Sequence, residues 1–150
     1  MGNIFIKGAK VYIDNAFLKK TIEIVDSKIK IHEEGYTLPS DAVLVDADGK
    51  RLVPGFIDIH THGGVGVDVN SATADELEKI GEFFASNGTT SWLCSILTDT
   101  KEQTEWCIEQ FNEYQKSERS GSNLVGIHLE GPFLAKEYKG AMPEYLLRKF

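Results

Sequence analysis

Residues 53–64, VPGFIDIHTHGG, contain the strongest structural signal of the chain. The apolar run of this stretch is short and is bounded by turn residues, so we expect a buried strand over residues 55–62. Residues two apart in a strand project to the same face, so Asp58, His60 and His62 point one way, at successive depths toward the carboxyl end. Two imidazoles placed in this way can hold one cation.

Upstream of this stretch, short segments that alternate with a period of two predict half-buried strands. These segments are residues 4–6, 10–13, 21–25, 28–31 and 43–45. The pairs Asp14-Asn15 and Asp26-Ser27 are turn residues that suit hairpin connections. Residues 1–53 are therefore predicted to form a small antiparallel β domain.

Downstream, strands alternate with segments of helical period, which is typical of βα units and a parallel sheet. We expect a helix from a capping box at Thr73 and Glu76 to Gly88, a strand over residues 89–97, a helix capped in the same way by Thr100 and Gln103, and a strand over residues 124–130. The fold class is thus α/β, with three strands of a parallel sheet in residues 54–150, an arrangement that would suit the start of a (β/α)8 barrel. A full barrel needs roughly 250 residues, so we expect an incomplete one.

Composition narrows the class of protein. The chain has 150 residues, 41% of them apolar, and a net charge of -7 without a run of like charges. It should fold as a globular protein, with neither nucleic acid nor an anionic membrane as its partner. Neither a signal peptide nor a membrane span is recognisable, so we expect a cytoplasmic protein. Cys94 and Cys107 are interpreted as reduced core thiols.

Three of the four histidines fall in two short motifs, at residues 58–62 and 128–132. Glu130 ends a predicted strand, at the face where barrel enzymes gather their catalytic groups, so it can reach the cation held by His60 and His62. Zinc or iron accepts imidazole and carboxylate ligands, and a catalytic site leaves one position open for water. We assign no catalytic role to Asp58 or His128.

Each of these residues also has an interpretation that involves no metal. An HxH pair is usually a pair of polar residues on the wet face of a sheet, but here it follows apolar positions, where uncompensated histidines would be costly. Glu130 alone could be a surface or capping carboxylate. Asp58 is better explained as a structural acceptor, and His128 as a partner of a ligand or as a core histidine. His32 is expected at the surface of a hairpin.

Two motifs resemble a known family. Residues 46–50 (DADGK) and 53–64 resemble the entry to the barrel in the metal-dependent amidohydrolase superfamily. Residues 128–134 (HLEGPFL), followed by 139–141 (KGA), resemble the N-acetylglucosamine-6-phosphate deacetylase family within it. The resemblance runs over nearly the whole chain. It implies that residues 1–53 belong to a small β-sandwich domain and that residues 54–150 begin the barrel.

The resemblance also implies an activity and its residues. Members hydrolyse the acetamido group of N-acetylglucosamine 6-phosphate, an amino-sugar phosphate, with one or two divalent metal ions, and the full-length enzyme is expected to be a homodimer. Glu130 matches the glutamate metal ligand, and His60 and His62 match the histidine pair of members with a second metal. Ala141 and Met142 match positions that approach the sugar. Many members have histidine at the latter position, so that contact is lost or is made by the backbone alone.

Other elements of the family pattern are expected beyond Phe150: two further histidine ligands, the phosphate-binding groups and the catalytic aspartate. We therefore expect that this chain alone does not deacetylate at a useful rate. Two alternatives are open. One is another amidohydrolase, acting on a cyclic amide or a nucleobase. The other is a truncated fragment or interaction module without catalysis, whose open strand edges would favour association.

Overall fold

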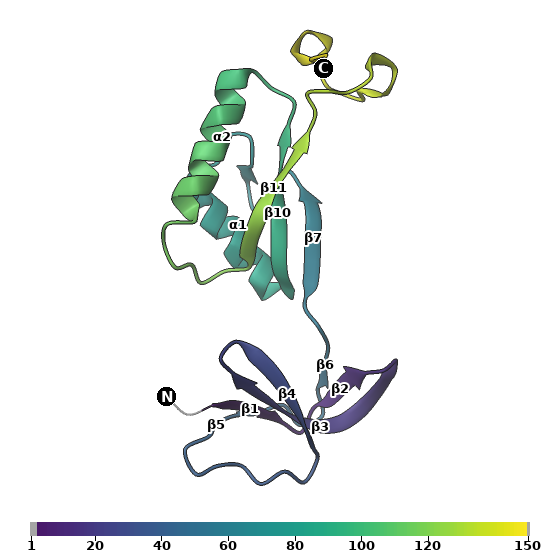
Figure 1. The fold of residues 1–150 in the computed structure, drawn as a ribbon, viewed down its shortest axis with the longest axis vertical. Helices are drawn as coiled ribbons and strands as arrows, with labels where there is room; N and C mark the ends of the chain where they lie inside the picture. Colours follow the sequence, from purple (N-terminus) through teal and green to yellow (C-terminus); the bar gives the residue numbers. More distant parts are fainter. Residues whose placement is uncertain (1–2, 150) are drawn as a thin grey trace. The chain divides into compact units, whose positions relative to one another are not determined.

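The computed structural model describes residues 3–149, which divide between Pro54 and Gly55 into two compact units (Figure 1). The sequence placed the boundary between residues 53 and 54. The mixed α/β class is confirmed, since the first unit is built of strands and the second of strands and helices. No helix among the described residues is long and apolar enough to cross a membrane.

The first unit is one six-stranded sheet. Its strands are β1 (Ile4–Lys7), β2 (Lys10–Ile13), β3 (Ala16–Val25), β4 (Lys28–Glu33), β5 (Val43–Asp46) and β6 (Arg51–Leu52). β3 is antiparallel to β1, β2 and β4. β1–β5 and β2–β6 are parallel pairs, so the prediction of a purely antiparallel unit was right only in part.

The predicted hairpin turns are confirmed. Asp14, Asn15, Asp26 and Ser27 all have positive φ between 49° and 62°. Turns that join two antiparallel strands through two such residues match the right-handed twist of the strands, and Asn and Asp tolerate this conformation better than most residues do. The turn chemistry thus sets the register of β2 on β3 and of β3 on β4.

The expectation for His32 was wrong. The His32 side chain is 20% exposed, and its Nε2 lies 2.8 Å from Oε2 of Glu23, a carboxylate that also accepts a 2.7 Å hydrogen bond from Asn3. The His32 ring stacks on Tyr36 at 3.8 Å between centroids. Thr21 and His32 are paired in the β3–β4 register, which carries the ring onto the same face as Glu23.

The second unit contains a parallel three-stranded sheet in the order β11-β10-β7. Its elements are β7 (Phe56–Thr61), β8 (Gly63–Gly64), β9 (Val67–Asp68), α1 (Ala74–Ser86), β10 (Thr89–Leu97), α2 (Lys101–Tyr114), β11 (Asn123–Glu130) and the short 3-10 helices η1 (Lys136–Tyr138) and η2 (Glu144–Leu146). All five predicted elements of this unit are present, but the first is not the buried strand that was expected, because Phe56, Ile57 and Ile59 of β7 are 66 to 68% exposed. The β8–β9 hairpin was not predicted.

The helices begin where the sequence placed them. Glu76 Oε2 accepts a 3.0 Å hydrogen bond from the Thr73 backbone N–H, and the Thr100 hydroxyl accepts a 3.1 Å bond from the Gln103 N–H. Gln103 does not return to its own cap, because its side chain donates instead to the Asn70 carbonyl, at 2.7 Å. The second cap is therefore only half of a capping box, and the other half ties α2 to the segment after β9.

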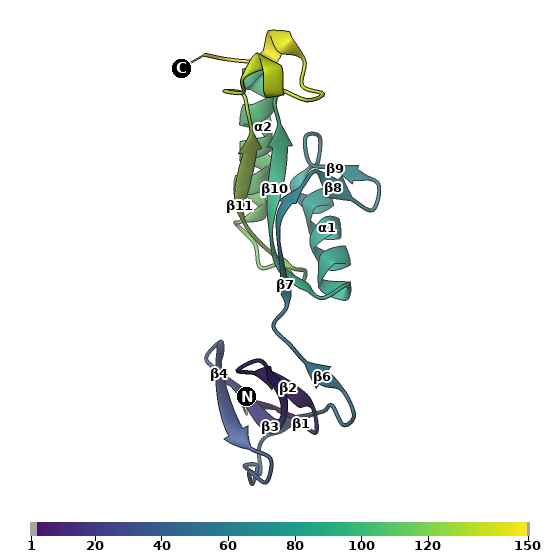
Figure 2. The same ribbon diagram turned by 90° about the vertical axis from the view of Figure 1, so that its right-hand side faces the viewer.

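Both helices lie on one face of the sheet, as Figure 1 and Figure 2 show. The core between them contains Ile80 of α1, Cys107 of α2 and the alternate residues Trp92, Cys94 and Ile96 of β10. Burial raises the pKa of the Cys94 thiol to about 12, and both cysteines are free, as expected. Since residues 92, 94 and 96 face the helices, Ser95 faces the opposite side of the sheet.

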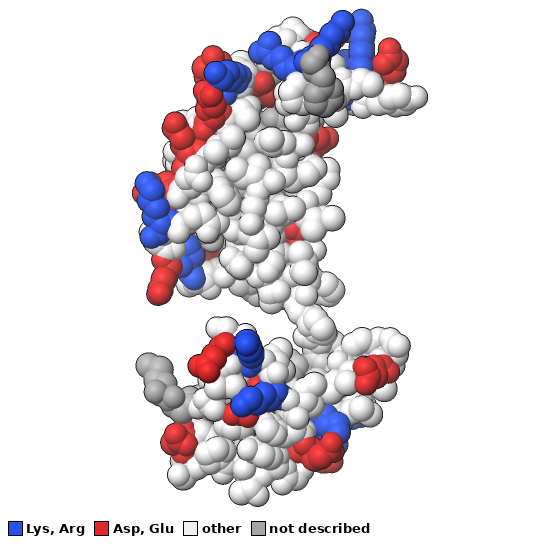
Figure 3. All heavy atoms as spheres, in the orientation of Figure 1, with Lys and Arg blue, Asp and Glu red and all other residues white. Residues whose placement is uncertain are grey.

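Charged and apolar surfaces separate on this unit. In Figure 3, lysine, arginine, aspartate and glutamate side chains gather along α2 and the C-terminal segment, with both signs interspersed. Exposed large apolar side chains lie on the two edge strands: Phe56, Ile57 and Ile59 on β7, and Val125 and Leu129 on β11. The charged side chains thus form a solvated face and give no basic patch in the view shown.

Candidate metal centre

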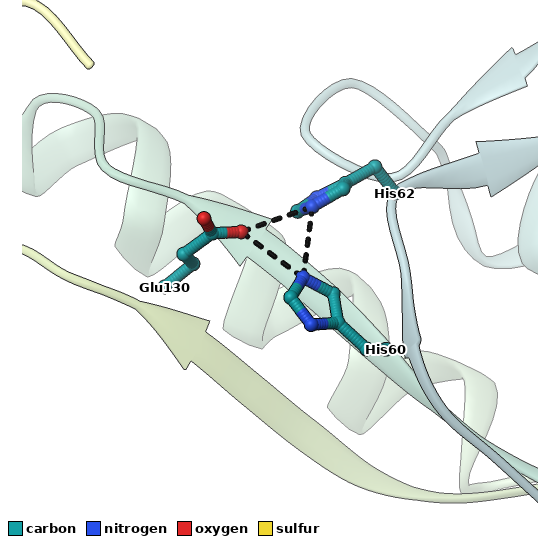
Figure 4. A group of neighbouring side chains, drawn as sticks. All are labelled: His60, His62 and Glu130. Carbon is teal, nitrogen blue, oxygen red and sulfur yellow. Dashed lines mark hydrogen bonds and ion pairs between the residues drawn. The ribbon is translucent and has the colours of Figure 1, made fainter. Parts of the chain in front are cut away.

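Three predicted ligands converge at the carboxyl ends of two strands (Figure 4). His60 Nε2 lies 3.1 Å from both His62 Nε2 and Glu130 Oε2, and His62 Nε2 lies 3.0 Å from the same carboxylate oxygen. The three atoms thus form a nearly equilateral triangle. Of the groups of histidine, cysteine, aspartate and glutamate within residues 3–149, this is the one whose ligand atoms could share an ion.

The sheet topology explains why residues 70 positions apart meet. His60 is in β7 and His62 directly follows it, so both project to the face of the sheet that the helices leave bare. Glu130 is the last residue of β11, on the far side of β10. Parallel strands present their carboxyl ends at one edge, which places the carboxylate opposite the imidazoles.

The turn after β11 fixes the position of Glu130. The Thr98 hydroxyl donates a 2.7 Å hydrogen bond to the Glu130 backbone carbonyl. Gly131 follows with φ of +101°, and a Cβ atom there would lie 1.9 Å from Thr98 Oγ1. Glycine is therefore required at this position, because the chain has no room for a side chain where it leaves the strand.

The arrangement fits a divalent cation. At ligand distances of about 2.0 to 2.1 Å, neighbouring ligands of a tetrahedral ion lie about 3.3 Å apart. The three observed separations, 3.0 to 3.1 Å, are close to that value. The donor set is two imidazole nitrogens and one carboxylate oxygen, the set that zinc and other borderline metals accept. His60, His62 and Glu130 could thus bind a metal.

The carbonyl oxygen of Ser95 decides which His62 nitrogen carries the proton. His62 Nδ1 lies 3.1 Å from that oxygen, which can only accept a hydrogen bond. Nδ1 therefore acts as the donor, which leaves Nε2, the nitrogen that faces the triangle, as the one that can bind an ion. A ligating histidine is commonly oriented in this way by a backbone carbonyl.

Asp58 and His128 lie beside the ligands but outside the triangle. Asp58 Oδ1 accepts a 3.0 Å hydrogen bond from the His60 backbone N–H, the structural role that the sequence suggested. His128 Nδ1 lies 3.0 Å from Ser95 Oγ, and its ring centroid lies 4.6 Å from that of His60. Sequence reasoning missed Ser95. The available signal was a hydroxyl residue between Cys94 and Ile96 in an apolar strand.

Ala141 and Met142 lie in the segment after β11, along a hollow of about 440 Å³. Its wall also contains Thr98, whose hydroxyl bonds to the Glu130 carbonyl, so the hollow adjoins the end of β11. Met142 is largely buried, and its backbone carbonyl accepts a 2.8 Å hydrogen bond from Lys139 Nζ. The segment is thus held in place by the lysine of the KGA motif.

Known proteins resemble the chain over most of its length. It is 33% identical to N-acetylglucosamine-6-phosphate deacetylase of Bacillus subtilis over 151 residues, which is 97% of this chain and 38% of that protein. It is 32% identical to N-acetylgalactosamine-6-phosphate deacetylase of Escherichia coli O157:H7 over 111 residues, 74% of this chain and 29% of that protein. No protein-family model matches.

A solved structure confirms the likeness of the fold. The crystal structure of N-acetylglucosamine-6-phosphate deacetylase from Pasteurella multocida superposes with a TM-score of 0.85 at 28% identity, over 97% of this chain and 38% of that one. The chain thus spans between 29% and 38% of the length of these relatives. By sequence and by fold, the chain matches one part of the N-acetylglucosamine-6-phosphate deacetylases, in agreement with an N-terminal portion of these proteins.

Proposed function

We propose that this chain provides the metal-ligating part of a deacetylase for N-acetylhexosamine 6-phosphates, with N-acetylglucosamine 6-phosphate as the first substrate to test. One observation carries the proposal: His60, His62 and Glu130 bring three ligand atoms within 3.1 Å, in a chain similar to deacetylases of this class. The alternative, an amidohydrolase for cyclic amides or nucleobases, is not favoured, since the curated relatives are named as amino-sugar-phosphate deacetylases.

The barrel assignment belongs to this proposal. Parallel strands β7, β10 and β11, joined by α1 and α2 on one face, correspond to the first three strands of a (β/α)8 barrel over residues 54–150. Residues 1–53 correspond to part of a β-sandwich domain. Support comes from the ligands themselves, which lie at the carboxyl ends of the strands, where barrel enzymes place their active sites.

The proposed ion is zinc or iron, with one or two ions per site. A divalent ion held here would polarise an amide carbonyl and lower the pKa of a water molecule that it binds. His60 and His62 supply neutral donors, and Glu130 supplies one negative charge against the two charges of the ion. The Ser95 carbonyl keeps the His62 proton on Nδ1, so that Nε2 stays available as a donor.

The sugar is proposed to lie against the hollow beside Ala141 and Met142. Asp68 and Asp99 are on its wall, which suits sugar hydroxyls as hydrogen-bond donors and disfavours a phosphate there. Because Met142 is largely buried, its contribution is through the backbone. A homodimer, which the resemblance to the deacetylases implies, and a cytoplasmic location complete the proposal.

A chimera tests the function. This chain would replace the matching part of the Bacillus subtilis relative, and acetate release from N-acetylglucosamine 6-phosphate and N-acetylgalactosamine 6-phosphate would be measured with zinc or iron present. We expect release from at least the first, reduced at least about 100-fold by Glu130→Gln because the ion loses its charged ligand. The matched control is Glu137→Gln, an exposed glutamate of η1.

The outcomes separate the interpretations. A folded, metal-loaded chimera that releases no acetate from either sugar contradicts the proposed function. So does a Glu130→Gln chimera that keeps the parent rate. Activity on dihydrouracil or a hydantoin instead of the sugars would favour the cyclic-amide alternative.

A further inference from the structure

Ser95 is a polar residue in an otherwise apolar part of the central strand. Its side chain is fully buried, and its neighbours Cys94 and Ile96 are core residues. β10 lies between β7 and β11, so Ser95 can reach both outer strands. It does so with two different atoms: its carbonyl oxygen lies 3.1 Å from His62 Nδ1, and its hydroxyl lies 3.0 Å from His128 Nδ1.

The hydroxyl contact follows from strand register. Ser95 and His128 are directly paired across β10 and β11, and their side chains project to the face that carries the ligands. A buried hydroxyl without a partner costs free energy, and so does a half-buried imidazole. Each group therefore stabilises the other, and the bond fixes the plane of the His128 ring.

His128 in turn contacts a ligand. Its ring centroid lies 4.6 Å from that of His60, at 53° between planes. The His60 side chain is 51% exposed, so it needs a neighbour to hold its ring in one orientation. The ring of His128 therefore packs beside that of His60.

We propose that Ser95 and His128 are positioning residues for the metal centre: the Ser95 hydroxyl orients His128, and the His128 ring holds His60 with Nε2 toward Glu130. This inference rests on the proposed metal site. Partners of metal ligands contribute about 10-fold to 100-fold to metal affinity. A purely structural role for the pair predicts lost stability with unchanged affinity, so the two explanations give different results.

The test is a Co²⁺ titration of the full chain, followed by the ligand-field absorption of the ion. Ser95→Ala and His128→Ala should each weaken binding at least fivefold and alter the absorption spectrum. The double variant should bind as weakly as His128→Ala alone, because the hydroxyl acts only through His128. Ser91→Ala, a serine of the same strand outside the site, is the matched control.

Two further variants separate the contribution of the His128 ring from that of its hydrogen bond to Ser95. His128→Phe keeps a ring against His60 but loses the bond to Ser95, and His128→Asn keeps a polar group for that bond but loses the ring. We expect the asparagine variant to bind Co²⁺ more weakly than the phenylalanine variant. If Ser95→Ala does not fold, as judged by circular dichroism, the Co²⁺ affinities of His128→Phe and His128→Asn decide the question instead.

The results distinguish this inference from the metal site on which it rests. Affinity within fivefold of the parent in Ser95→Ala or His128→Ala overturns the inference, as does a phenylalanine variant weaker than the asparagine variant. The metal site still stands in that case if His62→Ala and Glu130→Gln lose Co²⁺ binding. A parent chain that binds no Co²⁺, or a His62→Ala chain that binds as tightly as the parent, overturns both.

Discussion

Gly131→Ala is expected to damage both the fold of the second unit and its metal site. The backbone at Gly131 has φ of +101°, where a residue with a Cβ costs about 1 to 3 kcal/mol. The new Cβ would lie 1.9 Å from Thr98 Oγ1, so the hydroxyl must move from the Glu130 carbonyl, and that bond contributes about 0.5 to 1.5 kcal/mol. The free energy of unfolding should fall by about 1.5 to 4.5 kcal/mol.

Tryptophan fluorescence during urea unfolding measures this change selectively. Trp92 and Trp106, the two tryptophans of the chain, both belong to the second unit, so the signal is independent of the β domain. Co²⁺ affinity provides the second measurement, because displacement of the end of β11 moves Glu130 from His60 and His62. We expect binding to weaken together with stability.

Two variants separate backbone strain from the collision. Gly140→Ala has φ of +59° and no atom within 4 Å of the new Cβ, so it should lose only about 1 to 2 kcal/mol and keep Co²⁺ affinity. Thr98→Ala removes the hydroxyl with which the new Cβ of Gly131→Ala would collide. The double variant should therefore lose less free energy of unfolding than the sum of the two single variants. Additive losses, or a Gly131→Ala loss below about 0.5 kcal/mol, would refute the reasoning.

Three other predictions concern single side chains. Val65 is β-branched and 53% exposed, and its φ is +48°, a conformation that asparagine adopts more readily than valine. Val65→Asn should therefore raise the free energy of unfolding by about 0.5 to 1 kcal/mol in the same urea assay, and a lower free energy of unfolding would contradict this. The His32 imidazole, as hydrogen-bond partner, lowers the pKa of Glu23 below its usual value, so the pair should stabilise the β domain above the unfolded pKa of about 4.5. That stability should be lost as the pH falls through the pKa of Glu23 in the folded chain. Glu23→Gln should therefore abolish the loss of stability in acid, as measured by circular dichroism. An unchanged pH profile in this variant would rule out the contribution of the pair. Burial raises the pKa of the Cys94 thiol to about 12, so a thiol reagent at pH 8 should label Cys94 only in urea, and rapid labelling of the native chain would be inconsistent with a core thiol.

Local sequence signals were sufficient for most elements of the fold, but not for the two-residue strands β6, β8 and β9. Alternation gave the strands, the pairs Asp14-Asn15 and Asp26-Ser27 gave the hairpins, and Thr73 and Thr100 gave the helix starts. Each of these signals acts over a few consecutive residues, so no tertiary contact is needed to recognise it. The β8–β9 hairpin escaped because Val65, at its turn, has a conformation that valine rarely adopts.

Features that depend on register could not be predicted in the same way. His32 was placed at the surface because nothing local shows that Thr21 lies opposite it and that Glu23 is on the same face. Ser95 was missed for the same reason, since its partner His128 is 33 residues away and is set by the pairing of β10 with β11. Strand pairing, rather than propensity, decides these contacts.

The candidate ligands His60, His62 and Glu130 stand in two separate motifs of the sequence, and the convergence that the strand pattern predicts for them depends on β10. That strand separates β7 from β11 and supplies Ser95, which contacts His62 through its carbonyl and His128 through its hydroxyl. An ion bound by both outer strands would be lost whenever the sheet opens, so metal binding and unfolding of the second unit must be linked. At an ion concentration 100 times the dissociation constant, the linkage is about 2.7 kcal/mol. If the proposed function holds, the same three side chains serve both the metal site and the integrity of the sheet, and a change that loosens β10 should weaken both.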